Sequence, residues 1–452
     1  MKKLLLTAAL AFGLSLAAQQ APAPLVKGER VMFLGDSITH GGHYVSFLQL
    51  FQALRHPDRP VEIINAGISG QSAPGGIQRL DHDVFPQKPD RVFIMFGMND
   101  VGRHNYATDT PGEKTLKGRD RSLAAYRKNM TELVDKLQAA GKQVVLILPS
   151  PYDQYSNAKA KNLAACNEPG LAACAAIGRE LAAKKKLAVV DFHTPMTALL
   201  KKFPEKHLCG NDRVHPGQPG HLIMTALVLK ALGETPTVAE TVIRADKAAA
   251  ETKNATVSNI RKENGGLRFT YTPRSLPYPA TGYYKTVDAG IYPVTDTLNR
   301  EMLTVSGLAG DRFQLKADGK VIGTFSAAQL AKGVNLALLA TPSRKIADEA
   351  AKVNGKRHQV IQALRGIKQT DIIIAREKGN PDDLNSAIAT AEKWLAKQTK
   401  SPHVKYFTYV VNKYKKDKPD EALYRKQLPE LTAQLYETAK PRAYELAVVP
   451  VK

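Results

Sequence analysis

Short apolar runs alternate with amphipathic stretches over residues 29–233. Five of these runs have almost no polar interruption, which is typical of strands buried on both faces of a sheet. Strands that alternate with helices favour parallel pairing with right-handed crossovers. The pattern therefore predicts an α/β fold with a five-stranded parallel sheet. The predicted strands are 31–34, 61–64, 91–96, 144–148 and 187–190, and the predicted helices are 44–54, 121–140, 163–185 and 219–232.

This arrangement is a flavodoxin-like three-layer α/β/α sandwich, and the pattern changes after it ends. Residues 235–265 are polar and rich in Ala and Lys, which predicts a connecting helix. Gly265-Gly266 and Asp318-Gly319 each separate two strand-like runs and predict hairpins of a small β unit. We divide the chain into a signal peptide (1–23), the α/β domain (24–234), the connecting helix (235–265), the β unit (266–345) and a helical C-terminal region (346–452).

The N-terminus has the pattern of a secretory signal. Lys2 and Lys3 precede an apolar run over residues 4–16, which is too short to remain as a membrane span. Small residues follow, and they predict cleavage near Ala18 to Ala23. No cysteine follows the run, so we expect no lipid anchor, although an uncleaved tether is the alternative. We expect an exported protein, periplasmic or extracellular, with no membrane anchor.

Three cysteines occur in the chain, and export permits a disulfide. Cys166 and Cys174 flank the turn signal Glu-Pro-Gly at 168–170, so their pairing is our first prediction. Pairing of either with Cys209 is the alternative, and an odd count leaves one thiol over.

The formal net charge of +22 attracts anions by long-range steering. The lysines are scattered, and no basic stripe interleaved with aromatic residues indicates nucleic acid. For an exported protein an acidic polysaccharide is the more natural anionic partner. The simplest interpretation is a charged surface that keeps the protein in solution.

Three separated blocks contain chemically useful side chains. They are Gly-Asp-Ser-Ile-Thr at 35–39, Gly-Met-Asn-Asp at 97–100 and Asp-Arg-Val-His-Pro at 212–216. The first two follow predicted strands, and the third precedes the last predicted helix. Because the carboxyl ends of parallel strands meet at one edge of a sheet, these blocks are expected to lie together. A serine, a histidine, a carboxylate and an amide donor are the groups that acyl transfer requires.

Each group has a predicted role in that chemistry. Ser37 is the nucleophile, and His215 is the general base that takes its proton. Asp212 accepts the other ring N–H and fixes the tautomer. The predicted oxyanion donors are the backbone N–H groups of Ser37 and Gly70 and the side-chain amide of Asn99.

Over residues 29–232 the chain resembles the SGNH hydrolase superfamily, also called GDSL esterases and lipases. Ile38 replaces the leucine of the family's motif name, a change that does not touch the chemistry. Gly67 is a competing match for the glycine, but the second glycine of the block fits the family better. The matching positions are Ser37, Gly70, Asn99 and His215, with Asp212 as the usual acid partner.

The resemblance implies hydrolysis of esters or thioesters through an acyl-enzyme, with no metal and no cofactor. The histidines and the cysteine between 207 and 221 also fit no common zinc spacing. We expect an exported carbohydrate acetylesterase that acts on an acylated small molecule or glycan, for which an acidic glycan suits the net charge. The alternatives are a lipase, lysophospholipase or thioesterase, and a non-catalytic glycan-binding protein on the same scaffold.

Two further patterns allow two interpretations each. Asp191 and His193 follow the fifth predicted strand and either belong to the site or cap the next helix, and capping is preferred. Trp394 and the tyrosines at 278 and 283–284 either bind sugar or pack the parts of the chain together, and packing is preferred.

Overall fold

The computed structural model describes residues 20–451. Its α/β domain contains a five-stranded parallel sheet in the order β2-β1-β3-β4-β5. The predicted three-layer sandwich is therefore confirmed. Residues 1–19 of the predicted signal peptide lie outside the described part of the chain. The strands are β1 (Arg30–Gly35), β2 (Glu62–Gly67), β3 (Arg91–Met95), β4 (Gln143–Leu148) and β5 (Ala188–Asp191).

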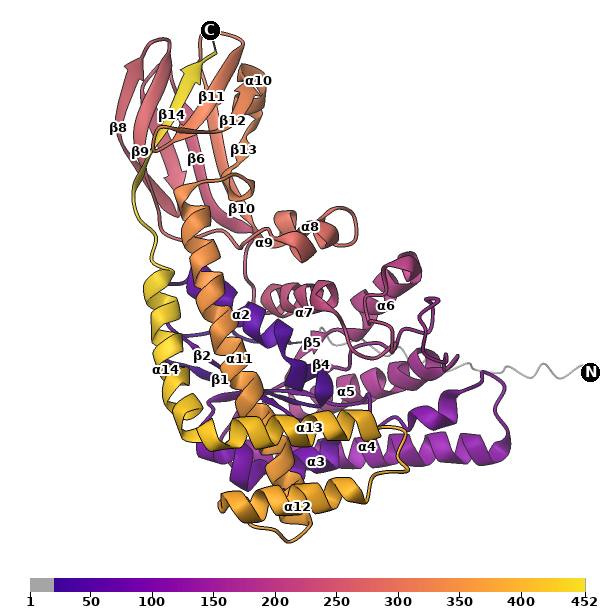
Figure 1. The fold of residues 1–452 in the computed structure, drawn as a ribbon. Coiled ribbons are helices and arrows are strands. Elements are labelled where there is room, and N and C mark those ends of the chain that lie inside the picture. The colour runs from indigo at the N-terminus through magenta and orange to yellow at the C-terminus, as the bar shows by residue number, and fades with distance from the viewer. Residues whose placement is uncertain (1–19, 452) are drawn as a thin grey trace, which may run out of the picture.

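Helices cover both faces of this sheet, as its apolar strands require. The rings of Phe33 and Phe93 stack between the neighbouring strands β1 and β3, with centroids 4.7 Å apart, and both side chains are buried. Helices α2 and α7 lie on one face and α3, α4 and α5 on the other (Figure 1). Their bounds are α2 (His43–Arg55), α3 (Ala73–Gln78), α4 (Glu113–Ala139), α5 (Ala172–Lys185) and α7 (Gln218–Ala231).

The β unit contains a four-stranded sheet in the order β13-β10-β6-β7 and a five-stranded sheet in the order β12-β11-β14-β9-β8. Both predicted hairpins are present, as β8 with β9 and β11 with β12. The strands are β6 (Thr237–Arg244), β7 (Ala249–Lys253), β8 (Ala255–Glu263), β9 (Gly266–Pro273), β10 (Arg300–Ser306), β11 (Arg312–Ala317), β12 (Lys320–Ser326), β13 (Val334–Asn335) and β14 (Tyr444–Pro450).

The connecting helix predicted over 235–265 is wrong, because this segment forms β6, β7 and β8. Along β6 the side chains of Ala239, Thr241 and Ile243 are buried while their neighbours Glu240 and Val242 are exposed. This alternation is the period of a strand with one buried face. Pairing with β10 and β7 outweighs the helical tendency of the Ala- and Lys-rich composition.

The C-terminal region is helical as far as Thr438 and then departs from the prediction. Its last strand, β14, returns to the β unit and pairs with β9 and β11. The helical region is thus inserted between strands of the β unit. Its helices are α11 (Pro342–Arg376), α12 (Leu384–Ala396), α13 (Val404–Asp417) and α14 (Glu421–Thr438).

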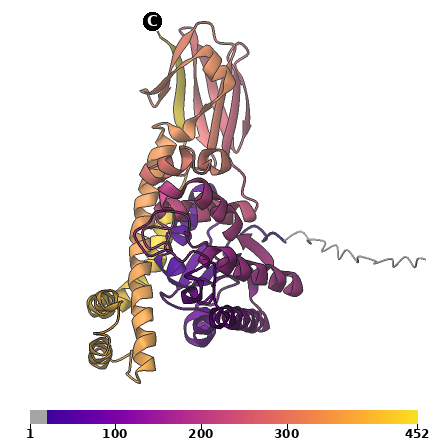
Figure 2. The same cartoon turned by 90° about the vertical axis from the view of Figure 1, so that its right-hand side faces the viewer.

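Helix α11 is 35 residues long and runs from the β unit along the α/β domain, past the edge strand β2 (Figures 1 and 2). Buried arginines attach it there. Arg357 Nη2 donates to the carbonyl of Ile63 (2.9 Å), and Arg365 Nε donates to the carbonyl of Gly67 (3.1 Å). These side chains occupy carbonyls that an edge strand leaves without partners. The helix therefore forms one body with the α/β domain.

No helix between residues 20 and 451 combines the length and the apolar character of a membrane span.

Candidate active site

The nucleophile candidate lies at a tight junction between β1 and the short helix α1 (Ser37–Gly41). Asp36 caps this helix, since its Oδ1 accepts the N–H of Ile38 at 3.0 Å. A Cβ at Gly35 would lie 2.3 Å from Thr39 Oγ1 and 2.8 Å from the carbonyl of Met95. Only glycine therefore fits before the turn that presents Ser37 at the carboxyl end of the sheet.

A chain of hydrogen bonds connects the three predicted catalytic side chains. Ser37 Oγ lies 2.7 Å from His215 Nε2, although the residues are 178 positions apart. His215 Nδ1 lies 2.5 Å from Asp212 Oδ2. This geometry suits transfer of the hydroxyl proton to the imidazole, with the carboxylate selecting the tautomer.

Asp212 is held in its ionised form. Partial burial raises its pKa, but hydrogen bonds from the ring and the backbone N–H of His215 and from the N–H of Val214 outweigh that effect. The result is a pKa of about 2. The carboxylate is thus available to stabilise an imidazolium at neutral pH.

The loop that carries His215 is anchored by Arg213, a residue that sequence reasoning passed over. Its buried guanidinium donates to four carbonyl oxygens of the 153–160 loop, at 2.8–3.0 Å. Its φ of +67° lies in the left-handed region, where a non-glycine residue is uncommon. A long donor side chain inside the Asp-Arg-Val-His block was the available signal for this anchor.

Two of the predicted oxyanion donors lie on loops that are tied to each other. Asn99 Nδ2 donates to the carbonyl of Gln71 at 2.8 Å, and Asn99 Oδ1 accepts from Arg103 at 3.3 Å. Asp100 connects the same two loops, since its carboxylate accepts the N–H of Ala73 at 2.8 Å. It also accepts the N–H of Gly97 in its own loop at 3.0 Å. Burial is the main reason that the pKa of Asp100 is raised to about 6.

The two glycines that compete for the donor role have different surroundings. A Cβ at Gly67 would lie 2.0 Å from the backbone nitrogen of His40, so this glycine permits close packing of α1 on β2. Gly70 is exposed, has a φ of +77°, and has open space where a Cβ would be. The position of Gly70 is therefore compatible with a ligand approaching its backbone.

A cavity of about 220 Å³ opens beside Ser37 and His215. His40 lies in its wall. His40 Nδ1 accepts the backbone N–H of Ser69 at 3.1 Å and lies 3.0 Å from Ser69 Oγ. Burial, followed by the nearby Arg365 and Arg79, lowers its pKa to about 3, so the ring is neutral and acts as an acceptor. It positions the loop that leads to Gly70.

The other side of the cavity comes from the C-terminal helices, where sequence reasoning found no functional residues. Gln362 and Gln369 of α11 and Tyr406, Tyr409 and Lys413 of α13 line it. The spacing of the two tyrosines puts them on one helix face, which was the only signal available.

Asp191 and the aromatic residues singled out in the sequence cap a helix or pack elements against each other. Asp191 Oδ1 accepts the N–H of Thr194 (2.9 Å), and its carboxylate pairs with Arg179 (2.8 Å), which is a helix-capping arrangement. Tyr283 stacks on Phe47 with ring centroids 5.2 Å apart, and the Trp394 ring packs edge-on against Phe407 at 5.1 Å. These aromatic side chains pack elements together.

The predicted Cys166–Cys174 disulfide is wrong. Both residues and Cys209 are free, buried thiols. All three side chains belong to the hydrophobic core of the α/β domain, where cysteine packs as a small apolar residue.

Comparison with known proteins agrees with this geometry. The profile of the GDSL-like lipase/acylhydrolase family matches residues 33–223. The acetylxylan esterase of Geobacillus stearothermophilus is 28% identical over 222 residues, covering 46% of this chain and 94% of that enzyme. The uncharacterized lipoprotein YqeF of Bacillus subtilis is 31% identical over 129 residues, 27% of this chain and 49% of that protein.

One solved structure is similar over nearly the whole length. BT4096, a gut microbial diltiazem-metabolizing enzyme, is 30% identical and has a TM-score of 0.81. The match covers 96% of this chain and 100% of BT4096, so the β unit and the C-terminal helices are shared. Together these findings confirm the resemblance predicted from the sequence: the chain belongs to the GDSL-like lipase/acylhydrolase family and is a hydrolase of ester bonds.

Proposed function

We propose that the protein is an exported serine esterase that removes acetyl groups from carbohydrates through an acyl-enzyme. In this proposal residues 24–234 form the hydrolase domain, and Ser37, His215 and Asp212 are its catalytic residues. The observation that carries the proposal is the unbroken hydrogen-bond chain from Ser37 Oγ to Asp212 Oδ2 beside an open cavity.

The proposed reaction has two halves. Ser37 Oγ attacks the ester carbonyl while His215 Nε2 takes the hydroxyl proton, which gives a tetrahedral intermediate. The N–H groups of Ser37 and Gly70 and the amide of Asn99 stabilise the oxyanion. The intermediate expels the alcohol, which takes its proton from His215. Water activated by His215 then attacks the acetyl-serine and releases acetate.

The substrate class is supported by two relatives. The acetylxylan esterase supports an acetylated carbohydrate. BT4096 metabolizes diltiazem, which is itself an acetate ester, so an acetylated small molecule is the second candidate.

The test compares esters of increasing acyl length. The protein is incubated with p-nitrophenyl acetate, butyrate and octanoate, and release of acetate is then measured from acetylated xylan and from diltiazem. We expect the rate to fall with acyl length and to be lost in Ser37→Ala. A preference for octanoate would support the lipase alternative. Absence of hydrolysis with every ester would support the binding-only alternative.

Export is supported by the basic and apolar N-terminal segment, and the similarity to a lipoprotein points the same way. Expression of the whole chain in a Gram-negative host, followed by mass measurement of the periplasmic product, tests this part. We expect a mature N-terminus between Ala18 and Ala23. A product that keeps residues 1–23 would contradict cleavage.

A further inference from the structure

The cavity at Ser37 is bounded by a surface from the opposite end of the chain. We call this surface the helical wall: Gln362 and Gln369 on α11, and Tyr406, Tyr409 and Lys413 on α13. It is firmly placed. Arg365 of α11 makes two hydrogen bonds of 2.8 Å to the buried carboxylate of Asp83 in the α/β domain. The wall is therefore in position before any ligand binds.

Two aromatic rings dominate the accessible part of the wall. Tyr406 is 42% exposed and Tyr409 is 61% exposed, which are large values for aromatic side chains. They lie three residues apart on α13 and so share one helix face. The Tyr406 hydroxyl accepts a hydrogen bond from Gln369 Nε2 at 3.1 Å. This bond connects the two helices of the wall. Exposed aromatic surface beside a reactive serine is suited to a ring-shaped ligand.

The polar groups of the wall carry almost no free charge. Lys413, its only Lys or Arg, pairs with the buried Asp417 at 2.5 Å. The Gln362 amide donates to the carbonyl of His40 at 2.7 Å, which connects the wall to the short helix α1 that begins at Ser37. Amide and hydroxyl groups next to aromatic faces match a neutral, hydroxylated ring better than an alkyl chain or a carboxylated sugar.

We propose that the helical wall binds the alcohol part of the substrate, with a neutral pyranose ring packed on Tyr406 and Tyr409. This inference rests on the proposed function, because it assigns the sugar side of the same ester. It also differs from the expectation of an acidic glycan drawn from the overall charge, because the lysine of the wall is already paired with Asp417.

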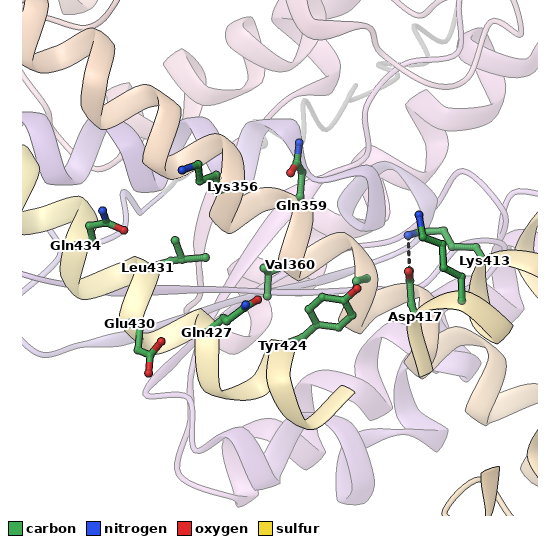
Figure 3. A pocket seen from close by; sticks show the side chains of 12 residues that line it. Lys356, Gln359, Val360, Lys413, Asp417, Tyr424, Gln427, Glu430, Leu431 and Gln434 are labelled. Atoms are coloured by element: carbon green, nitrogen blue, oxygen red, sulfur yellow. Dashed lines mark hydrogen bonds and ion pairs between the residues drawn. The ribbon is translucent and has the colours of Figure 1, made fainter. Parts of the chain in front are cut away.

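A neighbouring hollow supplies the matched control. It measures about 650 Å³ and lies between α11, α13 and α14, with Lys413 shared between the two cavities (Figure 3). Figure 3 shows Tyr424 of α14 and Val360 of α11 in this hollow, which Ser37 does not line. Tyr424→Ala therefore removes the same type of side chain at a position outside the wall.

The experiment separates sugar binding from chemistry. Initial rates are measured on acetylated xylotriose and on ethyl acetate, whose alcohol has no ring to pack on the tyrosines. We expect Tyr409→Ala to raise KM for the trisaccharide by about threefold to tenfold, a larger factor than for ethyl acetate. Tyr409→Phe should restore KM, and Tyr424→Ala should match the wild type. Equal KM values for Tyr409→Ala and Tyr424→Ala would overturn the proposal.

A binding measurement keeps this test separate from the proposed reaction. Ser37→Ala protein is titrated with acetylated xylotriose in a calorimeter, with and without Tyr409→Ala. Binding that weakens with Tyr409→Ala supports the wall even if the wild type cleaves no ester. No binding by the Ser37→Ala protein, or a Tyr409 dependence seen with diltiazem and not with the sugar, would refute sugar binding.

Discussion

The cavity beside Ser37 has two sides that are built in different ways. On the reactive side, Ser37 begins the short helix after β1, Asn99 lies on the loop after β3 and His215 lies on the loop before α7, and hydrogen bonds hold each of these segments. On the helical wall, the residues come from α11 and α13, and a buried ion pair between Arg365 and Asp83 holds them. Substitutions on the first side should change the rate of the chemical step. Substitutions on the second should change stability and affinity for the substrate.

The largest effect is expected from Asp212→Asn. An amide in place of the carboxylate donates to the ring instead of accepting from it, so His215 would hold the wrong tautomer. We expect kcat to fall by up to about 10⁴-fold on p-nitrophenyl acetate with little change in KM. The exposed Asp120→Asn on α4 is the control. A loss of less than about tenfold would remove Asp212 from the proposed relay.

Asn99→Ala tests the oxyanion site on the same side. Loss of one donor should lower kcat by about 10²–10³-fold while the protein remains folded. Thermal unfolding checks the fold, and the exposed Asn380→Ala is the matched variant. A kcat close to the wild-type value in Asn99→Ala would show that the amide does not stabilise the oxyanion and serves only to bind the carbonyl of Gln71.

Arg365→Met tests the attachment of the helical wall. Asp83 would keep its bond to Arg79 at 2.6 Å but lose both bonds to α11. We expect the free energy of unfolding to fall by about 2–3 kcal/mol, measured by urea denaturation. Arg376→Met, an exposed change on the same helix, should cost less than about 0.5 kcal/mol. Equal losses in the two variants would show that the ion pair does not hold the wall.

Asp36→Asn tests a smaller effect on the pH dependence of stability. Burial raises the pKa of Asp36 to about 7, from an ordinary value of 3.8. Between these values the folded protein binds a proton that the unfolded chain has released, so Asp36 makes stability fall as pH rises. The slope contributed is about 1 kcal/mol per pH unit between pH 4 and 7.

In Asp36→Asn this contribution should disappear, and the amide oxygen can still cap the N–H of Ile38. Urea denaturation at pH 5, 6 and 7 provides the measurement, with Ser37→Ala as the control that keeps the slope. The same slope in both variants would mean that Asp36 is ionised in the folded protein.

The sheet of the α/β domain was predictable because each strand carries its own evidence of burial. Runs such as 91–96 are apolar on both faces, and a strand of that kind has to lie inside a layered structure. The β unit offered weaker evidence. The one-sided alternation in β6 is followed by the Ala- and Lys-rich run 245–253, whose composition favours a helix, and only the pairing of β6 with β10 and β7 decides the conformation of this segment.

The final strand shows a second limit of local patterns. Residues 444–450 follow a long helical region, and their partners β9 and β11 lie more than 100 residues earlier in the chain. Nothing near the segment specifies that pairing. The cysteines are similar: a Glu-Pro-Gly turn suggested that Cys166 and Cys174 meet, whereas both thiols are buried in the core.

The sequence alone determined the parallel sheet, the family and the blocks that contain the candidate catalytic residues, because strand burial and short motifs depend on residues close together in the chain. Only the tertiary structure decided what faces those groups. Gln362, Tyr406 and Tyr409 become part of the cavity because distant buried contacts, above all Arg365 with Asp83, dock the helices there. Those contacts join residues about 280 positions apart, and no local pattern records such a pairing.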